Sequence, residues 1–334
     1  MEGAALSAPF AGKLMMRIHV NEAQVRRFSE FFASFRQNRP FDFCSLEEGS
    51  LFPPRGGEGV VEYFFFCTAH QFGFWKLAGD RYGAPMTAVV DGKMRKGSDF
   101  IVASATRAWN RDPRIFTREG LQLAGEEGWA EIFRDDQGAN PLPMWPEHLD
   151  IIRRYAAWLR DTEQTPAGIV AAANASPASL AAFLEAVAEI PVYSEDPMRK
   201  KLHLLAIILE TRPEHFLQVS DPQNHKPIID YHLQRSALRT GLVDVEDPGI
   251  RAVLEERRVV PEVVEHEIRA AVYDAVAQLV ERSGASVAAV DYFFFTNRTR
   301  CPEMREPDCP ACPVRDICAR RTRLFQPVFR TAAY

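Results

Sequence analysis

Apolar side chains between residues 146 and 296 recur every three to four positions, which is the spacing of helices that bury one face. The segment 261–282 is the clearest case, with one apolar face formed by Val264, Ile268, Val272, Ala275 and Leu279. Pro261 suits the first turn of this helix, and Gly284 suits the position after its last turn. The same reasoning predicts further helices over 147–160, 177–189, 197–210, 231–240 and 286–295.

The N-terminal part of the chain has a more mixed pattern. Residues 21–38 predict a helix, because Asn21 can cap it, Pro40 follows it, and an apolar stripe is formed by Val25, Phe28, Phe31, Phe32 and Phe35. Between residues 50 and 95, "GVVEYFFFCTA" and "PMTAVVDGK" read as short strands, although the first also suits a buried helix. We therefore predict a mainly α protein with a small mixed α/β N-terminal region. Its expected parts are 1–145, 146–296 and a C-terminal tail, 297–334.

Composition and charge narrow the class of protein. The chain has 334 residues, of which 46% are hydrophobic and 25% charged, and no apolar run approaches the length of a membrane span. The N-terminal "MEGAALSAPFAGKLMM" has no secretory pattern, so a cytoplasmic protein without a membrane partner is expected. The net charge of −5 provides no overall attraction for a polyanion, which makes nucleic acid a less favoured partner than a small nucleotide.

Four of the six cysteines lie close together near the C-terminus. Cys301, Cys309, Cys312 and Cys318 are spaced C-x7-C-x2-C-x5-C, which favours a metal centre over disulfides in a cytoplasmic chain. Four thiolates suit either zinc or a [4Fe–4S] cluster. The spacing resembles the C-x6-C-x2-C-x5-C iron–sulfur loop of endonuclease III-type DNA glycosylases, so we favour the cluster, in a structural role. The two other cysteines, Cys44 and Cys67, have no ligand spacing and are expected to be buried.

The glycosylase resemblance directs attention to an aspartate at a helix start. In "PIIDYHLQRSALRTGLVD", Asp230 stands where a helix begins, and His232 follows as a minor candidate. A carboxylate at this position accepts backbone N–H bonds and is expected to keep its charge. It could then stabilise the oxocarbenium-like sugar that forms as an N-glycosidic bond breaks. The DNA-gripping hairpin "LPGVGxKTA" of those enzymes is absent as a motif, which points to a smaller substrate.

A second family is similar over a longer stretch, from about residue 64 to residue 296. "AHQFGFW" looks like the "ALNFCFW" segment of the queuosine 5'-phosphate N-glycosylase/hydrolases, the queuosine salvage proteins. "DPMRKKLHLLAIIL" is similar to their "FYKRAQLLVADL", "IIDYHLQRSALRTGLVDVED" to "FADYRVPQVLRYLGVLEYS", and "EHEIRAAVYDAV" to "EIEIRANTIWAVE". Their fold is similar to that of the helix–hairpin–helix DNA glycosylases, which explains why both resemblances occur.

This second resemblance implies hydrolysis of a 7-deazaguanine nucleoside 5'-monophosphate to the free base and ribose 5-phosphate, with Asp230 as the catalytic residue. It further implies substrate-binding roles: base stacking by Phe72 and Trp75, and phosphate binding by Lys200, Lys201 or Arg269. Glu267 and Arg269 are expected at the substrate site, with a buried polar pair as the alternative. Asp99 lies in "GSD", where the family has "GYW". Because this difference falls where base recognition is expected, the sequence leaves the identity of the base open.

Two other classes of function remain open from the residues. One is an iron–sulfur DNA glycosylase that excises a modified or damaged base after flipping it into the pocket. The other is a non-enzymatic nucleotide-binding or redox-sensing protein. For the hydrolase, the sequence leaves open whether Asp230 assists attack by water or attacks the sugar itself.

Overall fold

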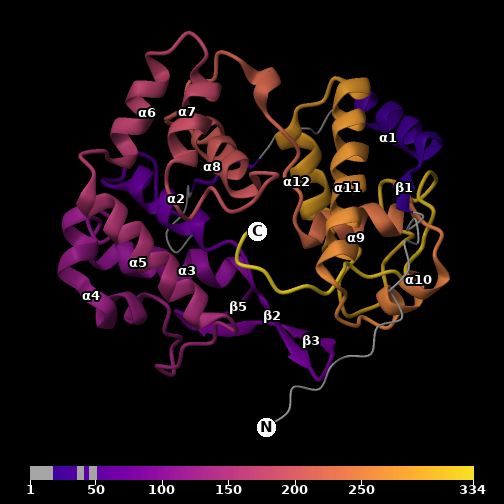
Figure 1. The fold of residues 1–334 in the computed structure, drawn as a ribbon, viewed down its shortest axis with the longest axis horizontal. Coiled ribbons are helices and arrows are strands. Elements are labelled where there is room, and N and C mark those ends of the chain that lie inside the picture. Colours follow the sequence, from indigo (N-terminus) through magenta and orange to yellow (C-terminus); the bar gives the residue numbers. More distant parts are fainter. Residues whose placement is uncertain (1–17, 36–40, 45–50) are drawn as a thin grey trace.

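The structure, a computed structural model, describes residues 18–35, 41–44 and 51–334. The protein is mainly helical, as predicted: the described residues form twelve α-helices and three two-stranded antiparallel sheets. Figure 1 shows the helices in two groups, with α2–α8 on the left and α1 with α9–α12 on the right. Each group has its own cluster of buried apolar side chains.

The first group is built around α2 (Val60–Ala69), in which nine of the ten residues are buried. The expectation of a strand in "GVVEYFFFCTA" is therefore wrong, and the buried-helix alternative is correct. A segment that is apolar on all sides has neither the period of a strand nor that of a half-exposed helix, so its pattern could not decide between them. Helices α3, α6 and α8 contact α2.

The remaining elements of the first group include both small hairpins and six further helices. The predicted strand in "PMTAVVDGK" is confirmed as β4 of a hairpin whose turn, Asp91–Gly92, has positive φ at both residues. The bounds are β2 Trp75–Ala78, β3 Arg81–Pro85, β4 Thr87–Val90, β5 Lys93–Lys96, α3 Ser98–Arg111, α4 Arg118–Ile132, α5 Trp145–Asp161, α6 Pro166–Asn174, α7 Ser179–Ala188 and α8 Lys200–Thr211.

The second group packs around α11, and the predicted apolar face of that helix is buried at all five positions. Pro261 is the N-cap residue and so stands just before the first turn, while Gly284 has the predicted left-handed conformation. Asn21 caps α1 by accepting a hydrogen bond from the Gln24 amide, whereas Pro40 lies outside the described residues. The bounds are β1 Ile18–Val20, α1 Glu22–Ser34, α9 Tyr231–Thr240, β6 Val243–Val245, α10 Pro248–Glu255, α11 Glu262–Ser283 and α12 Val287–Asn297.

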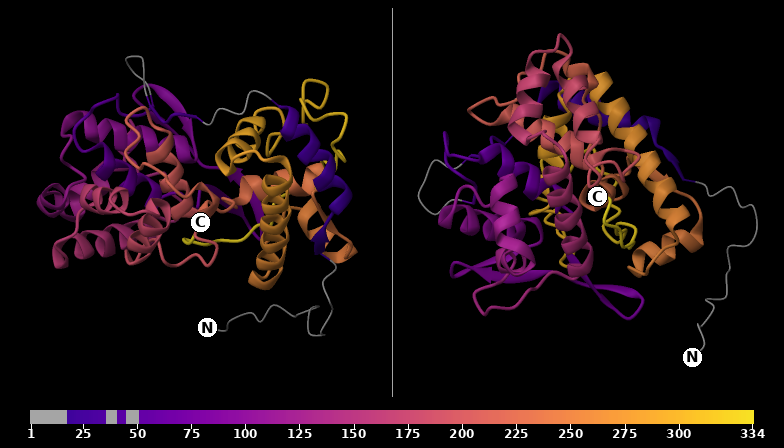
Figure 2. Two further views of the ribbon diagram at one scale, coloured as in Figure 1. Left: turned by 90° about the horizontal axis from the view of Figure 1, so that it is seen from above. Right: turned by 60° about the vertical axis from the view of Figure 1, so that its left-hand side comes forward.

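The C-terminal tail connects the two groups. Figures 1 and 2 show it leaving the second group and ending between the two. The Val260 amide donates to the Val328 carbonyl, and further along the tail Arg330 Nη2 donates to Pro143 O and Lys201 Nζ donates to Ala332 O. The predicted division of the chain at residues 145 and 296 stays a prediction. None of the helices in the described part of the chain is long and apolar enough to cross a membrane.

Candidate functional site

Asp230 lies at the start of α9, as the sequence predicts, and faces a cavity between the two groups of helices. Its Oδ1 accepts a hydrogen bond from the Leu233 amide at 2.9 Å, and the residue is half-buried. The buried Ile228 and Ile229 precede it, which fixes the chain where it enters the helix. The cavity has a volume of about 70 Å³ and is lined by Gln71, Phe74, Ser98, Lys200, Leu204, Ile228, Asp230, Tyr231, His232, Asp291, Phe295 and Tyr334.

A second, larger cavity of about 300 Å³ adjoins the first. The two share five lining residues, which are Gln71, Ser98, Leu204, Asp291 and Phe295. We call the two cavities together the central pocket. The larger part is mainly apolar, and its aromatic walls come from Phe41, Phe43, Phe52, Phe64, Tyr292 and Phe295. A concave apolar space with a few polar groups at one end is typical of sites for small molecules.

Asp291 is the second carboxylate of the central pocket, and the sequence analysis missed it. Burial, together with the negative charge of Asp230, raises the pKa of Asp291 to about 7, although the charge of Lys200 acts in the opposite direction. The residue lies in "VAAVDYFFFTN", an apolar stretch without a catalytic motif. The one available signal was that Asp291 is the single charged residue of α12. Two neighbouring carboxyl groups in different environments are suited to different roles in acid–base chemistry.

Lys200 supplies a positive charge that interacts with both carboxylates. It is the first residue of α8, is buried, and donates from Nζ to the Gln71 carbonyl at 3.1 Å. Burial lowers the pKa of Lys200, whereas the nearby charges of Asp230, Asp291 and Asp196 act in the opposite direction. The substrate-binding position predicted for Lys200 is therefore within the central pocket.

His232 lies in the same pocket, but its environment disfavours the imidazolium. Burial lowers the pKa of His232 well below its usual value, and the charge of Arg235 lowers it further. Arg235 Nη2 donates to His232 Nδ1 at 3.0 Å, which requires the neutral ring to accept at that nitrogen. Glu303 approaches the same side of the ring, with Oε1 at 3.6 Å from Nδ1.

Phe72 and Lys201 lie behind the pocket rather than in its wall. Phe72 is fully buried and stacks on His148 with ring centroids 4.1 Å apart. Lys201 Nζ lies 4.7 Å from the Phe72 ring centroid and donates to the tail carbonyl of Ala332 at 2.7 Å. Burial, with the charge of Lys200, lowers the pKa of Lys201 to about 7. Phe72 is therefore part of the buried apolar cluster of the first group of helices, and Lys201 contacts both Phe72 and the C-terminal tail.

Trp75 lies outside the central pocket, whereas Asp99 lies in its wall. Trp75 is buried in β2, stacks on Tyr82, and lines a small adjoining cleft together with Tyr231 and Tyr334. Asp99, in the first turn of α3, lines the larger part of the pocket, 3.8 Å from the Nη2 atom of Arg298.

Arg269 is occupied by protein partners. Its two terminal nitrogens each donate to one carboxylate oxygen of Asp196 at 2.7 Å, and Nε donates to the Ile229 carbonyl at 3.1 Å. This bidentate pair is buried and fixes the chain just before Asp230. Glu267 is half-buried on the same helix, whereas the unpredicted Glu265 is buried and accepts from Gln234 Nε2 at 2.9 Å.

We expect Arg269→Gln to destabilise the fold strongly, because it leaves the Asp196 carboxylate buried without its cation. Loss of one partner of a buried ion pair costs about 3–5 kcal/mol. Arg282→Gln, on the exposed side of the same helix, is the matched control and should change the free energy of unfolding by less than about 0.5 kcal/mol. Urea denaturation of both variants measures the difference. Equal unfolding midpoints would contradict the role given to Arg269.

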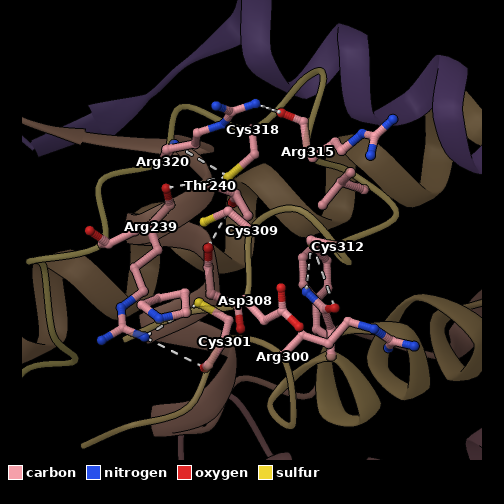
Figure 3. A pocket seen from close by; sticks show the side chains of 16 residues that line it. Arg239, Thr240, Arg300, Cys301, Asp308, Cys309, Cys312, Arg315, Cys318 and Arg320 are labelled. Atoms are coloured by element: carbon pink, nitrogen blue, oxygen red, sulfur yellow. Dashed lines mark hydrogen bonds between the residues drawn. The ribbon is translucent and has the colours of Figure 1, made fainter. Parts of the chain in front are cut away.

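The four C-terminal cysteines line one further pocket, between the end of α9 and the end of α12. This pocket is separate from the central pocket and is drawn in Figure 3. Its lining includes Cys301, Cys309, Cys312 and Cys318. Across the described residues, no group of three or more His, Cys, Asp and Glu side chains converges as ligands of a single metal ion. Cys44 and Cys67 are buried in other parts of the protein, as predicted.

Comparison with known proteins relates the first half of this architecture to one family. Residues 51–202 match the family model of the queuosine salvage protein. The matched segment includes α2–α7, nine of the 19 residues that line the larger part of the central pocket, and Lys200. Asp230 and Asp291 lie beyond it in the sequence and face the same pocket in the structure. No curated protein matches the chain at a significant level.

Proposed function

We propose that the protein is an N-glycosidase that hydrolyses the base–sugar bond of a queuosine-type, 7-deazaguanine nucleoside 5'-monophosphate. The match of residues 51–202 to the queuosine salvage protein supports a nucleotide or nucleoside of this kind as substrate. The observation that carries the catalytic part of the proposal is the placement of Asp230, Asp291 and Lys200 around one pocket of suitable size. The helical arrangement is also compatible with the proposed relation to helix–hairpin–helix glycosylases.

Asp230 would stabilise the sugar as the glycosidic bond breaks. Positive charge develops at C1' and the ring oxygen, and a carboxylate held by a backbone amide is already oriented towards it. The same carboxylate could orient the attacking water or form a bond to C1' itself, and the geometry is compatible with both routes. In either route, Lys200 limits the repulsion between the two carboxyl groups of the pocket.

Asp291 would deliver a proton to the departing base. The electron pair of the C1'–N bond goes to the base, which needs a proton to leave as a neutral molecule. A carboxyl group with a pKa near 7 holds that proton at neutral pH and can release it. The proton is replaced from the water that becomes the new hydroxyl group of ribose 5-phosphate, so the overall reaction is a hydrolysis.

Of the residues first predicted to contact the base and the phosphate, Lys200 keeps its role and the others are replaced. Phe74 and Phe295 line the pocket beside Asp230, so they are better placed than Phe72 to stack on a flat base. Arg298 stacks on Phe295, with its guanidinium carbon 3.7 Å from the ring centroid, and its Nη2 atom lies 3.8 Å from Asp99 Oδ1. Arg298 lies next to two residues that line the pocket, Asp99 and Phe295, and together with Lys200 and the start of α3 at Ser98 it would form a cationic edge for a monophosphate.

We expect Arg298→Met to raise the KM for the nucleoside 5'-monophosphate by about tenfold or more. A hydrogen bond to a charged group contributes about 1.5–3 kcal/mol, and the lower end of that range corresponds to roughly a tenfold change in affinity. The KM for the matching nucleoside should stay nearly unchanged. Steady-state kinetics with both substrates separate these effects. Arg160→Met, at an exposed residue that forms an ion pair with its neighbour Asp161, is the control. An equal rise for nucleoside and nucleotide would place the phosphate elsewhere.

Mass-spectrometric detection of the released base tests the proposed function directly. The full-length protein is incubated with 7-deazaguanine nucleosides, their 5'-monophosphates, the corresponding unmodified purine nucleotides and lesion-bearing duplex DNA. Release of base from the 7-deazaguanine 5'-monophosphate with the highest kcat/KM is the expected result. Release of base from DNA alone would indicate a repair glycosylase instead. Release of base from none of these substrates would overturn the assignment as an enzyme.

A further inference from the structure

We propose that Cys301, Cys309, Cys312 and Cys318 are the ligands of a [4Fe–4S] cluster, and that this cluster fixes the loop 301–318 against α9. The proposal does not depend on the substrate of the central pocket. It rests on a chain segment without regular structure that nevertheless brings four thiols to the wall of one pocket. Figure 3 shows these four side chains together with the arginines that surround them.

The arrangement of the thiols favours a cluster over a single ion. A tetrahedral zinc ion holds its four sulfurs about 2.3 Å from one centre, so the sulfurs themselves must nearly touch. The described side chains contain no such convergent group, although all four thiols border the same space. A cubane of four irons and four sulfides binds one thiolate at each iron and therefore spreads its ligands around a larger core.

The charges around the pocket suit an anionic centre. Four thiolates around a [4Fe–4S]2+ core carry a net charge of −2, and four arginines line the pocket: Arg239, Arg300, Arg315 and Arg320. Asp308 lines the same pocket and offsets one of these charges, so the lining keeps an excess of positive charge that suits an anionic centre.

Individual N–H groups also point at the sulfur atoms. Arg239 Nη1 lies 3.3 Å from Cys301 Sγ, and the backbone amide of Arg320 lies 3.3 Å from Cys318 Sγ. The side-chain amide nitrogen of Asn297 lies 3.6 Å from Cys312 Sγ. Hydrogen bonds to cluster sulfurs are one of the ways in which a protein stabilises an iron–sulfur centre.

The loop is joined closely to the C-terminal end of α9. The Ala319 amide donates to the Thr240 carbonyl at 3.1 Å, and Arg239 Nη1 donates to the Pro302 carbonyl at 2.7 Å. At the helix end, Gly241 has φ +83°, and a Cβ atom at this position would lie 2.7 Å from the Cβ of Ala319. The loop can therefore approach the helix only because this residue is glycine.

The loop also sends one side chain towards the central pocket. Glu303, two residues after Cys301, is buried and accepts a hydrogen bond from Tyr82 Oη at 2.7 Å. Its other carboxylate oxygen lies 3.6 Å from His232 Nδ1 and 3.7 Å from Arg235 Nη1. A fixed loop would keep Glu303 beside the residues that follow Asp230, which makes Glu303 a positioning residue.

Metal analysis of the full-length protein, purified without oxygen, tests the proposal. We expect about four iron and four acid-labile sulfide per chain, with broad visible absorption and, after reduction, the electron paramagnetic resonance signal of a [4Fe–4S]1+ cluster. Cys309→Ser and Cys312→Ser should each lose most of the iron. Cys67→Ala, at a buried cysteine of the other core, should retain it. One zinc per chain would overturn the proposal, as would four reduced thiols without any metal.

A second comparison separates this proposal from the proposed function. Asp230→Asn should retain the full iron content, whatever its effect on turnover. If Cys309→Ser does not fold, iron and sulfide in the wild-type protein still decide the question. An iron-loaded protein that releases no base would contradict the proposed function alone, and an active protein without iron would contradict the cluster alone.

Discussion

Asp230→Asn is expected to lower kcat by about a hundred- to a thousandfold while leaving the fold intact. Loss of the negative charge removes the stabilisation of the developing oxocarbenium ion, an effect of the size seen when a preorganised electrostatic contact is deleted. Asparagine is also a good N-cap residue, so α9 should still begin at the same residue. Single-turnover release of base, followed together with the circular dichroism spectrum, measures both results.

The control for Asp230 is a second aspartate with the same structural role. Asp247 caps α10 by accepting from the Gly249 and Ile250 amides, away from the central pocket. Asp247→Asn should therefore have close to wild-type turnover. If Asp230→Asn also released base at the wild-type rate, Asp230 would be only a helix cap.

Asp291→Asn is expected to lower kcat by about a hundredfold or more at pH 6 and to change the pH profile. With a raised pKa of about 7, the carboxyl group is protonated below that pH and loses its proton above it. As a proton donor, it should make kcat fall as the pH rises through about 7. The asparagine variant has no such proton, so this falling limb should disappear. Measurement of kcat from pH 5 to pH 9 tests both statements.

Asp274→Asn, at an exposed position of α11, provides the comparison for Asp291 and should keep the wild-type profile. A rate that rises through pH 7 in the wild-type protein would assign Asp291 the opposite role, that of a base which activates water. An unchanged falling limb in Asp291→Asn would assign the proton to another group.

The sequence predicted those features that depend on local pattern. The helix α9 and its cap at Asp230 followed from a few consecutive residues, and the buried face of α11 followed from its period. The pattern failed at α2, because a helix enclosed on all sides has no polar face to mark its period. Asp291 could not be assigned either, since its significance comes from two other helices, α8 and α9, that bring Lys200 and Asp230 to it.

The predicted substrate residues show the same dependence on tertiary structure. Lys200 and Lys201 are neighbours in sequence, yet one faces the central pocket and the other bonds to the tail. Arg269 was predicted to bind phosphate, but the carboxylate that engages its guanidinium lies 73 residues earlier, at Asp196. Long-range partners of this kind are not visible in one sequence.

Helix α9 has the candidate catalytic carboxylate at one end and the cysteine loop at the other. Its ten residues span about 15 Å, and both Arg239 and Thr240 bond to the loop. Hydrolysis transfers no electrons to or from the protein. An enzyme built in this way would still lose activity in air, because oxidative loss of iron would loosen one end of the helix whose other end must hold Asp230 in register with the sugar.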